Sequence, residues 1–117
     1  MNIEDLREYC LSKKGVTESF PFDETTMVFK AMNKMFAITD LEDDFGVVLK
    51  CDPEEFFNMR EQYPAVTQPR YFRGNWNHIL IDGSIDVRLI KEWIDKSYDL
   101  IVSGLPKKDK KVLGIEC

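Results

Sequence analysis

The sequence predicts a single two-layer α+β domain, in which helices pack on one face of an antiparallel sheet. Three short runs rich in β-branched and aromatic residues follow one another at 26–31, 35–41 and 45–51. The short connections between them force antiparallel pairing, because a parallel crossover needs about a dozen residues or more. Segments with helical apolar spacing lie before, between and after the strands. We therefore expect about five strands and three helices in the order α-β-β-β-α-β-β-α.

The three expected helices have recognisable start and stop signals. Asn2 is placed to cap the first helix. Asp52, followed by proline and two glutamates, is typical of the start of the second helix, which should end before Pro64. Ser84 is the expected cap of the last helix, and Gly104 marks its end.

Two further strands complete the expected sheet. A short strand is predicted around 69–73 and a firmer one at 76–81, separated by a turn-prone pair that begins at Gly74. The domain is expected to span residues 1–106, and residues 107–117 to form a loose basic C-terminal tail.

The composition is that of an ordinary globular protein. The chain has 117 residues, of which 44% are hydrophobic and 32% charged, with a formal net charge of −5. That charge argues against a protein coated with phosphate-binding cations, although a local basic patch is compatible with it. No apolar run reaches the ~20 residues of a membrane helix, and the amino terminus lacks the pattern of a signal peptide. We expect a cytoplasmic protein with no membrane partner.

Few residues suggest catalysis or metal binding. The three cysteines, Cys10, Cys51 and Cys117, are far apart in the sequence and form no C-x-x-C pair, so neither a disulfide framework nor a zinc site is expected. No phosphate-cradling loop or nucleophile motif is present. The candidates for a catalytic site reduce to His78, Cys51 and Asp82. The sequence therefore predicts no enzyme, no catalytic residues, no cofactor and no metal.

One stretch departs from the rest of the chain in its charge. Residues 62–81 contain no aspartate or glutamate, although the whole chain has 21 acids in 117 residues. Arg70 and Arg73 are thus locally uncompensated and suited to phosphate contact, while Asn75 and Asn77 are suited to hydrogen bonds with base edges. The alternative is a structural hairpin, whose aromatic residues belong to the core and whose arginines keep it soluble.

Several motifs, in the right order over nearly the whole chain, resemble the MmcQ/YjbR-like family. They are Gly15-Val16-Thr17-Glu18-Ser19-Phe20-Pro21-Phe22, Leu49-Lys50-Cys51-Asp52-Pro53, Tyr63-Pro64, Asn75-Trp76-Asn77, Asp82-Gly83, Ser97-Tyr98-Asp99-Leu100-Ile101 and Gly104-Leu105-Pro106-Lys107-Lys108. The resemblance implies an α+β fold likened to bacterial frataxin (CyaY) and to secretion chaperones. It also implies a proposed DNA-binding role, in which two β-hairpin wings straddle the duplex.

Segments 30–34 and 70–77 are the two candidate wings. The residues expected to contact DNA are Lys30, Lys34, Arg70, Arg73, Asn75, Asn77 and His78. The family often has His-Trp-Asn where this chain has Asn75-Trp76-Asn77. So few cations predict weak, strongly salt-dependent binding. The alternative is a protein-interaction or chaperone-like module that binds no nucleic acid.

Acidic residues receive a simpler interpretation. Glu4, Asp5 and Glu8 are a thin version of the iron-binding ridge of frataxin, and solvated helix acids explain them better. The acidic segment 40–44 lacks the donor spacing of an EF-hand and is interpreted as a solvated turn. The remaining prediction concerns Trp76, which is expected to be largely buried in the core.

Overall fold

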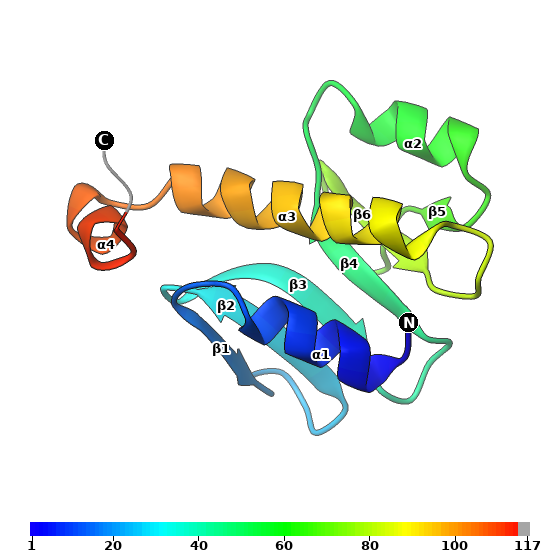
Figure 1. Cartoon of the computed structure of the whole chain (residues 1–117). Coiled ribbons are helices and arrows are strands. Elements are labelled where there is room, and N and C mark those ends of the chain that lie inside the picture. The colour runs from blue at the N-terminus through cyan, green and yellow to red at the C-terminus, as the bar shows by residue number, and fades with distance from the viewer. Residues whose placement is uncertain (115–117) are drawn as a thin grey trace.

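A six-stranded antiparallel sheet with helices on one face forms the body of the molecule (Figure 1), seen in a computed structural model that describes residues 1–114. The strand order is β1-β2-β3-β4-β6-β5. The elements are α1 (Ile3–Leu11), β1 (Val16–Ser19), β2 (Thr26–Ala31), β3 (Lys34–Asp40), β4 (Gly46–Lys50), α2 (Phe56–Gln62), β5 (Val66–Thr67), β6 (Trp76–Leu80), α3 (Val87–Ser103) and α4 (Lys107–Val112). The predicted α+β class is confirmed. No helix within residues 1–114 combines the length and apolarity needed to cross a membrane.

Two elements lie where the sequence predicted none. β1 lies at residues 16–19, where no strand was expected, and it pairs with β2 through Val16 and Ala31. Its residues show no apolar alternation, because an edge strand of four residues is held mainly by backbone hydrogen bonds. α4 lies in the expected loose tail, and Leu113 directly after it is buried. The rest of that tail, residues 115–117, lies outside the described residues.

The strand expected around 69–73 is absent. β5 comprises only Val66–Thr67 and pairs with β6, and residues 68–75 form a loop between the two strands. Pro69 is buried and Phe72 packs on the sheet, so this loop lies against the face that the helices leave free. The aromatic residues that suggested a strand are there to anchor the loop.

The helix termini follow the sequence signals with two exceptions. Asn2 and Asp5 form a reciprocal capping box at α1, as expected. α2 ends before Pro64, but it begins at Phe56 and not at Asp52, because Asp52 accepts the N–H of Glu54 in a turn that precedes the helix. The cap of α3 is Asp86 and not Ser84, since the Asp86 carboxylate accepts the N–H of Arg88 in the first turn while the Ser84 hydroxyl donates to Asp82.

The sheet has apolar side chains on both faces, but in unequal amounts. The main core lies between the sheet and the helices and contains fully buried Phe29, Phe36 and Leu49. A smaller cluster lies on the opposite face, which we call the open face. It consists of Val28, Ile38 and Val48, with Met35, Phe72 and Trp76 packed against it.

Ser97 fastens α3 to the middle of the sheet. Its buried hydroxyl donates to the carbonyl of Phe36 at 2.6 Å and accepts the backbone N–H of Lys50 at 2.9 Å. These two bonds join the helix to β3 and β4 together. The helical layer is therefore held in one place, and the open face is the side available for other contacts.

Candidate functional site

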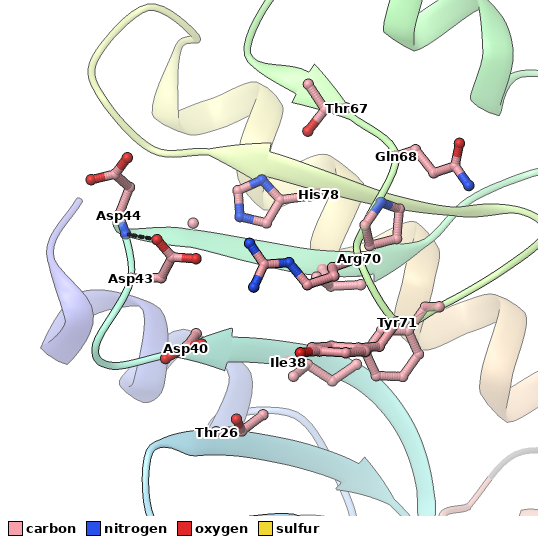
Figure 2. Close-up of a pocket in the computed structure, with 14 residues that line it drawn as sticks. Thr26, Ile38, Asp40, Asp43, Asp44, Thr67, Gln68, Arg70, Tyr71 and His78 are labelled. Atoms are coloured by element: carbon pink, nitrogen blue, oxygen red, sulfur yellow. Dashed lines mark hydrogen bonds between the residues drawn. The ribbon is translucent and has the colours of Figure 1, made fainter.

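A cleft of about 490 Å³ opens between the open face and the loop 68–75 (Figure 2). Ile38 and Val48 of the open face form its floor, and residues 68–72 of the loop line its other side. The lining residues are Thr26, Ile38, Asp40, Asp43, Asp44, Gly46, Val48, Thr67, Gln68, Pro69, Arg70, Tyr71, Phe72 and His78. The volume is in the usual range for small-molecule sites.

Strand register brings the floor of the cleft together. Ile38 pairs with Val48, Val48 with His78, and His78 with Thr67. Directly opposed residues in antiparallel strands point to the same face of the sheet. A single row of side chains therefore runs from β3 to β5, with an apolar end and a polar end.

His78 owes its position to Gly46. The imidazole packs so closely on β4 that a Cβ atom at Gly46 would lie 2.6 Å from the ring. A glycine inside a strand commonly marks such a close approach. Burial lowers the pKa of His78, and the charges of Asp43 and Asp44 oppose that effect only in part. The imidazole is thus neutral at pH 7.

The β3–β4 turn makes one end of the cleft acidic. Asp40, Asp43 and Asp44 all line it, so the segment interpreted from the sequence as a solvated turn in fact borders the cleft. Figure 2 shows Arg70 extending its guanidinium from the loop across the cleft toward Asp43. No ion pair of Arg70 within 4.0 Å occurs in the described chain. The cleft is therefore lined by three carboxylates and by one cation, Arg70, that forms no ion pair with them.

The open face is basic away from that turn. Lys30 lies on it opposite Met35, and Lys50 lies opposite Trp76 with its Nζ atom 5.3 Å from the indole ring centre. Lys34, by contrast, is the register partner of Ala31, whose side chain belongs to the main core. Lys30 and Lys34, which were expected to share a wing, are therefore directed to opposite faces of the sheet. Lys50, which lies on the open face, was not among the residues predicted from the sequence to contact DNA.

The arginines and aromatic residues of the loop 68–75, and Trp76 directly after it, differ in their exposure to solvent. Arg70 and Arg73 are exposed, as predicted, and Tyr71 is 81% exposed. Trp76 is only half-buried, because alternation along β6 directs it to the open face, where it packs with Phe72 at 5.5 Å between ring centres. Trp76 is therefore part of the smaller apolar cluster of the open face, less buried than expected, and not part of the main core.

The two asparagines expected to contact bases have structural hydrogen bonds. Asn75 donates from its side chain to the carbonyl of Cys51, and its own carbonyl accepts the Cys51 N–H at 2.7 Å. Asn77 is completely buried, where it accepts from Arg60 Nε at 2.7 Å and donates to the carbonyl of Phe56 at 3.1 Å. Asn77 thus fastens α2 to β6 from inside the fold and has no amide free for a base.

The catalytic candidates from the sequence do not meet in one place. Cys51 and Asp82 are absent from the lining of the cleft that contains His78. Burial raises the pKa of the Cys51 thiol to about 11, and Asp82 is an exposed acceptor for Ser84. Across residues 1–114, no three His, Cys, Asp or Glu side chains are arranged to hold a metal ion.

The lowered pKa of His78 predicts a specific loss of stability in acid. The unfolded imidazole titrates near 6.5, above the folded one, so stability should decrease as pH falls from 6.5 through the lower folded pKa. His78→Gln removes this contribution. We expect the melting temperature to decrease more between pH 7.5 and 5.0 in the parent than in His78→Gln. Equal decreases would contradict a neutral, buried imidazole.

An antiparallel sheet covered by helices on one face makes this chain an α+β protein, and its fold is similar to that of a DUF419 domain. The similarity is shown by the crystal structure of the Deinococcus radiodurans protein DR2400, described as a DUF419 domain, with a TM-score of 0.88 and 30% identity over 98% of this chain and 89% of that one. The YjbR family profile matches residues 11–100. The chain belongs to the YjbR family.

Further relatives agree with this assignment. The chain is 30% identical to Escherichia coli (strain K12) YjbR, an uncharacterized protein, over 97% of this chain and 98% of the relative. It is 28% identical to uncharacterized YbdF of Escherichia coli O157:H7, over 92% and 90% of the two chains. A crystal structure from Pseudomonas syringae has the same fold, with a TM-score of 0.74 at 19% identity over 86% of this chain and 99% of that one.

Proposed function

We propose that this protein is a DNA-associated accessory protein that binds a single strand along the basic part of its open face. The observation that supports this most directly is the grouping of Lys30 and Lys50 with Trp76 on one face, beside the loop that carries Arg73. Cations that follow a backbone and aromatic rings that stack on bases are the two components of single-strand recognition.

Tyr71 has the exposure that stacking of a base requires. It is 81% exposed, whereas Trp76 is half-buried beneath Lys50 and holds that cation on the open face. Stacking of a base on such a ring contributes about 1–3 kcal/mol. The cations are few, so the affinity should be low and should decrease steeply with salt.

The geometry favours one strand over a duplex held between two wings. Residues 68–75 lie against the sheet, whereas a wing would project from it. Lys30 and Lys34 point to opposite faces and cannot follow one groove together. The acidic turn at the far end of the open face repels phosphate, so the strand is expected to follow the Lys30 and Lys50 side.

Fluorescence anisotropy with a labelled oligothymidine and a matched duplex tests the proposal. We expect measurable binding of the single strand at low salt, weaker binding of the duplex, and a loss of affinity as salt increases. The double variant Lys50→Ala/Arg73→Ala should weaken binding and reduce the salt slope by about 1.4, since each single-strand phosphate contact contributes about 0.7.

The matched control removes the same charge elsewhere. Lys107 and Lys108 are exposed on α4. Lys107→Ala/Lys108→Ala should leave the affinity within about twofold of the parent, apart from the general effect of net charge. No binding at low salt, or equal losses in both double variants, would refute the proposed surface.

A protein-interaction role is the second candidate, and one observation favours it. Phe20 and Phe22, in the β1–β2 connection, are 43% and 59% exposed, and Leu41 is 45% exposed. Leu41 lies beside this connection, because its N–H donates to the carbonyl of Thr25 at 2.8 Å. Adjacent exposed apolar residues are typical of contact surfaces between proteins.

A further inference from the structure

We propose that the cleft on the open face binds a small organic cation, an ammonium or amidinium group attached to an aromatic or apolar body. This inference is independent of the proposed DNA contact, because the cleft is acidic where a phosphate site must be basic. Shape, lining and charge of the cleft each contribute to it.

The apolar residues that line the cleft indicate that the ligand has an aromatic or apolar body. Ile38 and Val48 provide an apolar surface in the middle of the sheet, and Tyr71 and Phe72 line the cleft from the loop. A volume of about 490 Å³ admits a molecule with one or two rings. A flat apolar group placed beside these two rings would lose part of its contact with water.

The charge of the ligand is indicated by the acidic end. Asp40, Asp43 and Asp44 face a neutral His78 and a single cation, Arg70, so the lining carries a net negative charge. A cationic group near these carboxylates reduces their mutual repulsion, whereas an anion increases it.

The guanidinium of Arg70 is the group that a cationic ligand would displace from the acidic end of the cleft. Its guanidinium, itself an amidinium-like cation, extends into the cleft toward Asp43 without forming an ion pair there (Figure 2). A free ligand with the same chemistry would compete with this side chain for the acidic end. Removal of Arg70 should therefore improve binding of the cation, in contrast to its usual effect on a DNA surface.

Two probes with the same aromatic body and opposite charge test the assignment. 2-Phenylethylamine and 3-phenylpropionate are each titrated into ¹⁵N-labelled protein at pH 7.5, and amide shifts are followed by NMR. We expect saturable shifts with the amine, concentrated at the cleft residues of β3, β4, β6 and the loop, and none with the carboxylate. No saturable shift with the amine, or similar shifts with both probes, would overturn the proposal.

Variants separate the cleft from nonspecific attraction to an acidic protein. Asp43→Asn/Asp44→Asn keeps the hydrogen-bonding shape and should weaken binding of the amine by roughly tenfold. Asp99→Asn, at an exposed carboxylate on α3, is the control and should have no effect. Arg70→Ala should tighten binding by roughly threefold. Equal effects of the Asp43/Asp44 and Asp99 changes, or weaker binding in Arg70→Ala, would overturn the assignment.

These outcomes are distinct from those of the DNA experiment. Arg70→Ala and Asp43→Asn/Asp44→Asn act on the cleft, while Lys50→Ala/Arg73→Ala acts on the basic part of the face. The dispersion of the NMR spectrum of each variant shows that it remains folded, so that a loss of binding is attributable to the changed side chain.

Discussion

Gly46→Ala is expected to destabilise the protein by about 2–3 kcal/mol, the upper part of the usual range for forcing an extra methyl group into a filled site. The added Cβ would lie 2.6 Å from the His78 ring and 2.8 Å from the carbonyl oxygen of Ile79. The ring can turn away, but the backbone of β6 cannot move without breaking its pairing with β4. Urea unfolding followed by circular dichroism measures the difference.

Gly104→Ala is the matched control. A Cβ atom at Gly104 meets its nearest neighbour at 3.6 Å, an ordinary contact, and the backbone of this residue is compatible with alanine. We expect a change within about 0.5 kcal/mol of zero. If Gly46→Ala has no larger effect than Gly104→Ala, the imidazole is not packed on β4 as described.

The same substitution should also affect the cleft. If the His78 ring turns away from Gly46, it enters the cleft or leaves the row that it shares with Val48 and Thr67. In a His78→Ala background, the destabilisation caused by Gly46→Ala should be smaller, because only the contact with the Ile79 carbonyl remains. Strict additivity of the two changes would contradict a direct contact between the ring and this position.

Asn77→Ala is expected to destabilise the protein by about 3 kcal/mol, because it leaves two groups without their buried partner. The Nε–H of Arg60 loses its acceptor at 2.7 Å, while its other bond, to the carbonyl of Trp76, remains, and the carbonyl of Phe56 loses its donor at 3.1 Å. Asn77 has no exposed surface, so water cannot replace the amide without opening the contact between α2 and β6. Equilibrium unfolding in urea again provides the measurement.

Asn58→Ala tests whether the effect belongs to the buried amide. Asn58 is an exposed residue of α2, the helix that Asn77 contacts, and its replacement should change stability by at most about 0.5 kcal/mol. An Arg60→Ala background should reduce the effect of Asn77→Ala, since one of the two lost bonds is then already absent. Similar effects of Asn77→Ala and Asn58→Ala would mean that this amide is not a structural link.

For the candidate site, the sequence predicted which arginines are exposed but not which residues lie beside them in space. The acid-free stretch correctly indicated exposed arginines at 70 and 73, because charge without a partner is usually solvated. It could not show that the acidic turn 40–44, distant in sequence, borders the same cleft. Nor could it separate Asn77 from an exposed amide, because the residue type is the same and only the packing of α2 supplies its two partners, Arg60 and the carbonyl of Phe56.

The sequence by itself determined the α+β class, the antiparallel meander and most helix ends. Its signals were the apolar period, the short connections and the capping residues, and each of these depends only on neighbours within a few positions of the chain. Tertiary structure decided the rest. The edge strand β1, the pairing of β5 and the path of residues 68–75 depend on partners far along the chain. Which side of the sheet each side chain faces depends on register, and a shift of one residue would exchange the two faces. The open face, and with it the cleft and the division between its acidic and basic parts, therefore exists only once the strands have paired.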